Sequence, residues 1–156
     1  MEKTNVMRTL DRLKIAYTPH CYASTDAISG VEVAQVLNQN PDQVFKTLVT
    51  VASSGGHYVF MVPVAQELDL KKAAKAVGEK KIEMIKSKEL LPLTGYIHGG
   101  CSPVGMKKPF KTVIHHTAEN FDTIIFSAGK IGYQVQLSLT DLTKAIKVIT
   151  EDIIVE

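Results

Sequence analysis

The stretch VFKTLVTVASSGGHYVFMVPVA, residues 44–65, decides the fold of this chain. Two runs rich in Val, Phe and Thr flank SSGG, residues 53–56, a pattern typical of a β-hairpin. Lys46 interrupts the first run, and strand alternation places it on the half-apolar face that carries Leu48 and Ala52. The lysine is therefore either an edge-strand residue that discourages sheet pairing or a cation held in a pocket to meet an anion.

The segments around the hairpin mix helical and strand patterns without regular βαβ alternation. This order predicts an α+β fold, in which helices flank a curled, barrel-like sheet of mixed or antiparallel strands. The length of 156 residues suits one domain, residues 1–156. The expected helices cover residues 5–14 after a Thr4 cap, 31–39, 69–78, 87–91 and 141–149 after a Thr140 cap. The expected strands cover residues 15–22, 44–52, 57–65, 95–100, 112–117, 123–129 and 133–139.

Composition places the chain among soluble globular proteins, with 45% apolar and 22% charged residues. It has no apolar run of membrane-spanning length and no signal-peptide core, so we expect a cytoplasmic protein without membrane contact. Cys21 and Cys101 are too far apart to indicate a disulfide scaffold or a zinc site. The histidines form no ligand pattern, and no nucleotide-binding motif is present, so we expect neither metal nor cofactor.

Positive charge is unevenly distributed along the chain. Residues 71–88 hold seven lysines against two glutamates, and Lys107, Lys108 and Lys111 form a second cluster. Such clusters suit a phosphate backbone, although solvated surface lysines are the alternative.

Two further segments carry polar or glycine-rich patterns. In TGYIHGGCSPVGMKKPF, residues 94–110, a strand is expected to run into a glycine pair whose free N–H groups could bind an oxyanion. In SAGKIGYQVQL, residues 127–137, two glycines bracket a turn that is flanked by Ser127 and Gln134. The alternatives are an ordinary turn and a hairpin with a polar outer face.

Cys101 is a candidate nucleophile, with His98 or His115 as its base. However, no Asn or Asp is placed to orient a histidine, and free cysteines are most often small buried residues.

Together these segments resemble the YbaK/EbsC family of aminoacyl-tRNA deacylases, and within it the YbaK-type Cys-tRNA(Pro) deacylases. The resemblance rests on residues 40–49, 62–84, 94–110 and 126–137. It implies a curled mixed sheet related to the editing domain of bacterial prolyl-tRNA synthetases. It also implies hydrolysis of a mischarged tRNA ester, a reaction classed with the hydrolases or the lyases. A second sieve is needed because cysteine and proline are too similar in size for binding alone to separate.

The resemblance also assigns roles to residues. The substrate sulfur is expected to attack its own carbonyl while the terminal ribose hydroxyl leaves, with no nucleophile from the protein. Lys46 then anchors the terminal nucleotide or the ester end, and the Gly99 amide stabilises the oxyanion. The expected substrate contacts are Tyr22, Thr47, Gly100, Ser102, Ser127 and Gln134.

Two departures from the family pattern leave the amino-acid preference open. Gln134 stands where many members have an aspartate, and Ser29 stands where some have a phenylalanine, in a shortened loop of residues 23–30. The expected partners are mischarged tRNA(Pro) and prolyl-tRNA synthetase, and the sequence does not indicate an oligomeric state. One alternative is deacylation of Ala-tRNA(Pro) or of other small aminoacyl-tRNAs. Another is a non-catalytic nucleotide- or RNA-binding module, which the lack of tryptophan disfavours.

Overall fold

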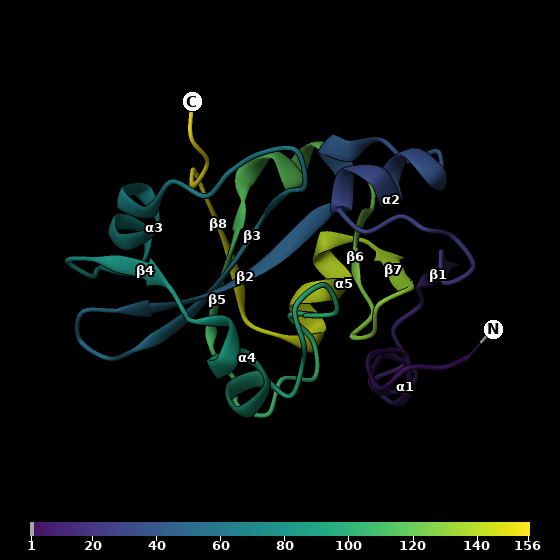
Figure 1. The fold of residues 1–156 in the computed structure, drawn as a ribbon, viewed down its shortest axis with the longest axis horizontal. Coiled ribbons are helices and arrows are strands. Elements are labelled where there is room, and N and C mark those ends of the chain that lie inside the picture. The colour runs from purple at the N-terminus through teal and green to yellow at the C-terminus, as the bar shows by residue number, and fades with distance from the viewer. Residues whose placement is uncertain (1) are drawn as a thin grey trace.

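The structure is a computed structural model that describes residues 2–156 (Figure 1). It confirms the predicted α+β class, with helices packed around two β-sheets. No helix in residues 2–156 is long and apolar enough to cross a membrane. The elements are α1 (Asn5–Arg12), β1 (Thr18–Cys21), α2 (Gly30–Val36), η1 (Pro41–Gln43), β2 (Phe45–Ala52), β3 (His57–Pro63), α3 (Leu70–Val77), β4 (Ile82–Met84), α4 (Ser87–Thr94), β5 (Lys111–His115), η2 (His116–Asn120), β6 (Ile124–Ser127), β7 (Tyr133–Leu137), α5 (Leu139–Ala145) and β8 (Val148–Glu151).

The predicted hairpin forms the centre of the larger sheet. β2 and β3 pair antiparallel from Phe45 opposite Pro63 to Val51 opposite His57. The strand order is β4-β2-β3-β5-β8, with β5 parallel to both of its neighbours. A smaller antiparallel sheet has the order β1-β7-β6 and meets the larger one at a parallel bridge between Val44 and Ile125. The sheet is therefore mixed, as predicted, but it is divided in two and is not a closed barrel.

Both faces of β2 contribute side chains to apolar clusters. Phe45 and Val49 belong to the larger core cluster, which contains β6, β7 and α1 side chains. Ala52 belongs to a second cluster, where Ala73 of α3 packs against Phe60 of β3.

Lys46 lies on a short stretch of open sheet edge. β4 pairs with β2 only at Thr50–Ala52, and the Ile85 N–H donates to the Val49 carbonyl just before that. Between Val49 and the bridge at Val44, no described strand pairs with this edge of β2. β2 is an inner strand of its sheet, but the part that carries Lys46 has no strand beside it on one edge. A cavity lies next to this uncovered part.

Residues 95–100, predicted as a strand, are a turn instead. α4 continues past its expected end before Pro92, because the Thr94 hydroxyl donates to the Leu90 carbonyl at 2.8 Å and the Gly95 N–H donates to the Leu91 carbonyl at 2.8 Å. Gly95 and Gly99 then take positive φ angles of +85° and +86°. Positive φ angles are incompatible with a strand.

The C-terminal prediction is wrong in two details. Ser138, and not Thr140, caps the last helix, and its Oγ accepts from the Asp141 N–H at 3.0 Å. The chain leaves the helix after Ala145, and residues Val148–Glu151 become β8, because this segment completes the parallel edge beside β5. Strand β4 was not predicted, since it lies in the lysine-rich stretch and buries only Ile82.

Candidate active site

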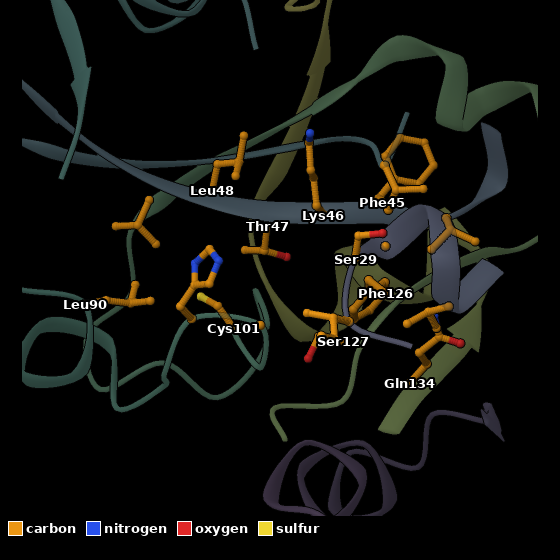
Figure 2. Close-up of a pocket in the computed structure, with 18 of the residues that line it drawn as sticks. Ser29, Phe45, Lys46, Thr47, Leu48, Leu90, Cys101, Phe126, Ser127 and Gln134 are labelled. Atoms are coloured by element: carbon orange, nitrogen blue, oxygen red, sulfur yellow. The ribbon is translucent and has the colours of Figure 1, made fainter. Parts of the chain in front are cut away.

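A cavity of about 440 Å³ opens beside the free edge of β2 (Figure 2). Its lining comes from β2, from the end of β6 and the start of β7, from α2 and from the segment between β4 and Cys101. A volume of this size lies in the range of small-molecule sites. The structure brings most of the predicted site residues to this one cavity: Tyr22, Lys46, Thr47, Gly99, Ser127 and Gln134.

Gly100 and Ser102 are not among the lining residues. A Cβ atom on Gly100 would lie 3.2 Å from the Ile131 main-chain nitrogen, so Gly100 packs against the turn between β6 and β7. Ser102 is fully buried, and its Oγ accepts from the Val104 N–H at 3.4 Å. In this position both residues support the glycine loop and do not face the cavity.

Lys46 is half-buried and is one of the residues that line the cavity. Burial lowers the pKa of its ammonium group below the ordinary value, and the Glu67 carboxylate partly opposes this effect. In Figure 2 the Lys46 side chain projects from one side of β2, whereas Thr47 projects from the other, toward Cys101 and Ser127. The Lys46 ammonium group therefore lies on the opposite side of β2 from Thr47, Cys101 and Ser127.

Thr47 carries polar groups without a partner beside the cavity. Its Oγ1 is buried without a hydrogen-bond partner in residues 2–156. The Val64 N–H donates to the Val44 carbonyl, and the Ala52 N–H donates to the Gly56 carbonyl, so even-numbered β2 residues use their main-chain groups toward β3. By the alternation of an antiparallel pair, the N–H and C=O of Thr47 face the open edge. Buried polar groups without partners are rare, so this cluster is suited to a ligand.

Gly99 forms part of the cavity wall in a tight turn. The Gly100 N–H donates to the Ile97 carbonyl at 3.0 Å, and the φ of +86° at Gly99 is one that glycine adopts without strain. Tyr96 anchors this loop, because its hydroxyl donates to the Val104 carbonyl. Burial raises the pKa of Tyr96 to about 12, so the hydroxyl stays protonated as a donor.

Ser127 and Gln134 face each other across the β6–β7 pair. The Ser127 Oγ accepts from the Gly129 N–H at 3.1 Å, which stabilises the turn. The Gln134 Oε1 accepts from the Gln39 Nε2 at 2.8 Å, a contact between residues that are 95 positions apart. The sequence gives no signal for Gln39 as a site residue, because it sits in a turn after α2 and belongs to no motif.

Comparison with known proteins is decisive for the family. The pattern described as "Aminoacyl-tRNA editing domain" matches residues 25–145. EbsC of Enterococcus faecalis, described as a candidate Cys-tRNA(Pro)/Cys-tRNA(Cys) deacylase, is 48% identical over 138 residues, which cover 88% of this chain and 84% of that protein. This chain belongs to the aminoacyl-tRNA editing domain family.

Solved structures agree with this fold. A crystal structure described as a candidate trans-editing enzyme for prolyl-tRNA synthetase matches this editing domain with a TM-score of 0.84 and 23% identity, over 99% of this chain and 100% of that one. The crystal structure of a hypothetical protein matches with a TM-score of 0.88 and 18% identity, over 97% of this chain and 100% of that one. At these identities the matches show the fold alone.

The protein thiol in the cavity of this editing domain is not activated. Cys101 is buried, and burial raises the pKa of its thiol to about 12, so the thiol is neutral at physiological pH. His98 lines the same cavity, but His115 lies elsewhere, where its Nδ1 accepts from the Ile153 N–H at 3.3 Å. A nucleophilic cysteine needs a lowered thiol pKa, so the geometry disfavours Cys101 in that role.

His115, His116 and Asp152 form a cluster away from the cavity, with potential ligand atoms within 4.8 Å of one another. Lys72 donates to both Asp152 carboxylate oxygens, at 3.2 and 3.1 Å. Metal-bound histidines normally donate their second ring nitrogen to an acceptor, whereas Nδ1 of His115 accepts from a main-chain N–H. The arrangement is that of an ion pair tying the C-terminal segment to α3.

Ser29 combines two local roles in this editing domain. Its Oγ accepts from the Glu32 N–H at 3.1 Å, and the Glu32 carboxylate accepts from the Ser29 N–H, which forms a capping box at the start of α2. Ser29 also lines the cavity. The helix signal S-x-x-E was present in the sequence, but its position beside the cavity was not predictable from it.

Proposed function

We propose that this editing domain hydrolyses the ester of Cys-tRNA(Pro), with the sulfur of the substrate as the nucleophile. The observation that carries the proposal is a single cavity lined by a half-buried lysine, a glycine of a tight turn and a protonated, unactivated protein thiol. Among the described lining residues, this site offers positive charge and hydrogen-bond donors but no activated thiol as a nucleophile. It therefore suits a substrate that carries one.

The reaction would proceed in two steps. The cysteinyl sulfur attacks the carbonyl carbon of its own ester, which closes a four-membered thiolactone and releases the ribose hydroxyl with the thiol proton. Water then opens the thiolactone to free cysteine. The Gly99 amide stabilises the oxyanion, and the loss of one such donor typically costs about 2.7–4 kcal/mol of barrier.

Lys46 anchors the terminal nucleotide in this proposal. Its position across β2 from Thr47, Cys101 and Ser127 suits a phosphate or ribose group better than the reacting carbonyl. Because Lys46 is half-buried, its charge is less screened by water than that of a surface lysine. The cavity of about 440 Å³ is large enough for a small aminoacyl group together with part of that nucleotide.

The acceptor stem is proposed to lie over the lysines beside the cavity. Lys86 is exposed between Ile85 and Ser87, both of which line the cavity, and Lys88 follows at the start of α4. These lysines form no ion pair within residues 2–156. Contacts of this kind are independent of base sequence, so we propose that prolyl-tRNA synthetase identifies the tRNA and this protein acts in trans.

Deacylation of Ala-tRNA(Pro) is the second candidate. Alanine has no thiol, so its ester needs a water molecule as the nucleophile. The main-chain N–H and C=O of Thr47 at the open edge of β2 could orient such a water. Deacylation rates of Cys-tRNA(Pro) and Ala-tRNA(Pro) separate the two candidates. Correctly charged Pro-tRNA(Pro), which should not be hydrolysed, is the negative control.

The test is deacylation by the Lys46→Ala variant. We expect loss of turnover with an unchanged circular dichroism spectrum and unfolding midpoint, because the Lys46 side chain makes no hydrogen bond or ion pair among the described residues that the fold would lose. The matched control is Lys75→Ala, which removes an exposed lysine from α3 outside the cavity. Wild-type turnover by Lys46→Ala would refute the anchoring role, and a wild-type protein that cleaves no aminoacyl ester would favour a binding module.

A further inference from the structure

The cavity lacks a counter-ion for an ammonium group. Among the described residues that line it, none is an aspartate or a glutamate, and Lys46 contributes a positive charge. Glu67 influences Lys46 from outside the lining, and Glu32 is engaged in the capping box of α2. An ammonium group inside this cavity would lose water and would be repelled by Lys46 without gaining an opposite charge.

One polar group of the cavity lining, the side-chain amide of Gln134, has a free hydrogen-bond donor. Gln134 is only 5% exposed and lines the cavity, and its Oε1 is used to accept from the Gln39 Nε2 at 2.8 Å. The Gln134 Nε2 makes no hydrogen bond in residues 2–156, where the side chain is engaged through its Oε1. An amide nitrogen donates and cannot accept, so it cannot bind an ammonium group.

Gln39 holds one end of the Gln134 side-chain amide. Its Oε1 is buried without a partner, so the contact with Gln134 does not satisfy Gln39 fully. In this arrangement the Gln134 oxygen accepts the hydrogen bond from Gln39. The Gln134 nitrogen then has no protein partner and can donate to a ligand.

We propose that this site holds its acyl ester by donating hydrogen bonds to the oxygen atoms of the substrate and gives the α-ammonium group no carboxylate partner, so that its substrates extend to thiol-bearing acyl esters that lack an α-amine. Gln134 contacts the ligand as a donor, and Gln39 is a positioning residue for it. This inference rests on the proposed ester hydrolysis. It states that the cavity recognises the thiol-bearing acyl ester and does not require the α-ammonium group.

The experiment compares cysteinyl-tRNA(Pro) with 3-mercaptopropionyl-tRNA(Pro), which keeps the thiol and lacks the amine. Each rate is divided by the hydrolysis rate of the same ester in buffer, because an α-ammonium group activates an ester chemically. We expect the normalised kcat/KM values to agree within about 3-fold, whereas an ammonium-binding site would lose about 10-fold or more. A loss of that size overturns the inference but leaves the proposed function in place. Failure to cleave either ester overturns both.

Two variants test the residues. Gln134→Glu supplies the missing carboxylate, so we expect it to favour the cysteinyl ester by about 10-fold over the deaminated one. Gln39→Met releases the Gln134 amide, and we expect the ratio of the two esters to move toward the cysteinyl ester. Gln35→Glu, on the exposed side of α2, is the matched control and should leave the ratio unchanged. A purely structural role would change both esters equally, so an unchanged ratio in both variants would overturn the assignment.

Discussion

Lys46 shows how the surroundings of one residue alter its chemistry. Burial lowers the pKa of Lys46 from its ordinary value of 10.5, so the ammonium loses its proton at a lower pH than a surface lysine does. An anionic ligand binds the protonated form, and its affinity should therefore fall as the pH rises toward 10.5.

The prediction is checked with a non-hydrolysable amide analogue of the aminoacyl end of tRNA. Its Kd should increase at a pH below 10.5 in the wild type. The Kd of the Lys46→Arg variant should change less with pH, because a guanidinium keeps its proton throughout this range. A wild-type Kd that is constant up to pH 10.5 would contradict the role of the charge.

Cys101 illustrates the opposite case, a reactive residue type in an unreactive setting. Because its thiol pKa is raised to about 12, almost no thiolate exists at pH 7.5. We expect the Cys101→Ala variant to turn over substrate within about 3-fold of the wild-type rate, at a stability cost of about 1 kcal/mol for the small cavity it leaves.

Single-turnover kinetics measure this effect, and Cys21→Ala, which removes an exposed thiol outside the cavity, is the control. If the Cys101→Ala variant alone lost at least about two orders of magnitude in rate, the cysteine would have to be reinstated as the nucleophile.

At the scale of the element, α2 connects helix capping to the cavity. Ser29→Ala removes the N-cap, a change that typically costs about 1 kcal/mol. Ser138→Ala removes the equivalent cap of α5, which lies outside the cavity. We expect urea unfolding to show similar losses for both variants, but only Ser29→Ala should raise KM, because α2 frays beside the bound ester. Equal KM values in the two variants would show that the Ser29 cap does not influence substrate binding.

β2 is the element on which the cavity depends. Its hydrogen bonds to β3 run along its whole length, but β4 covers only its last residues. The uncovered part exposes Thr47 and Lys46 from opposite sides of a strand that is rigidly held by its partner. A site built on such an element keeps its geometry better than one built on loops alone.

At the scale of the whole molecule, electrostatics should govern tRNA affinity. Each lysine contact with a phosphate releases counter-ions, so the logarithm of the binding constant falls linearly with the logarithm of the salt concentration. Replacing Lys86 and Lys88 by Ala should reduce the magnitude of this slope by about 1 for each lysine. Replacing Lys71 and Lys75, exposed lysines of α3 outside the cavity, should leave it unchanged. Equal effects of the two pairs on filter-binding isotherms would argue for diffuse attraction over the whole surface.

Local signals explain which elements were predictable. The hairpin of β2 and β3, the caps of α1 and α3 and the β6–β7 pair follow from residues that are close in sequence. β4 and β8 were missed, since each is a short strand that forms only because a neighbouring edge is available. Residues 95–100 resemble a strand in their apolar pattern, but the positive φ angles of the glycines turn the chain there.

The sequence by itself determined the hairpin, the lysine within it and the glycine motifs, because these depend on neighbouring residues and on resemblance to a family. Only the tertiary structure decided what surrounds them: the open edge at Thr47, the burial of Ser102 behind the loop and the contact from Gln39 to Gln134. The reason is physical. Burial, hydrogen-bond partners and the absence of a counter-ion are set by residues that lie far apart in the chain and meet only when the two sheets pack together.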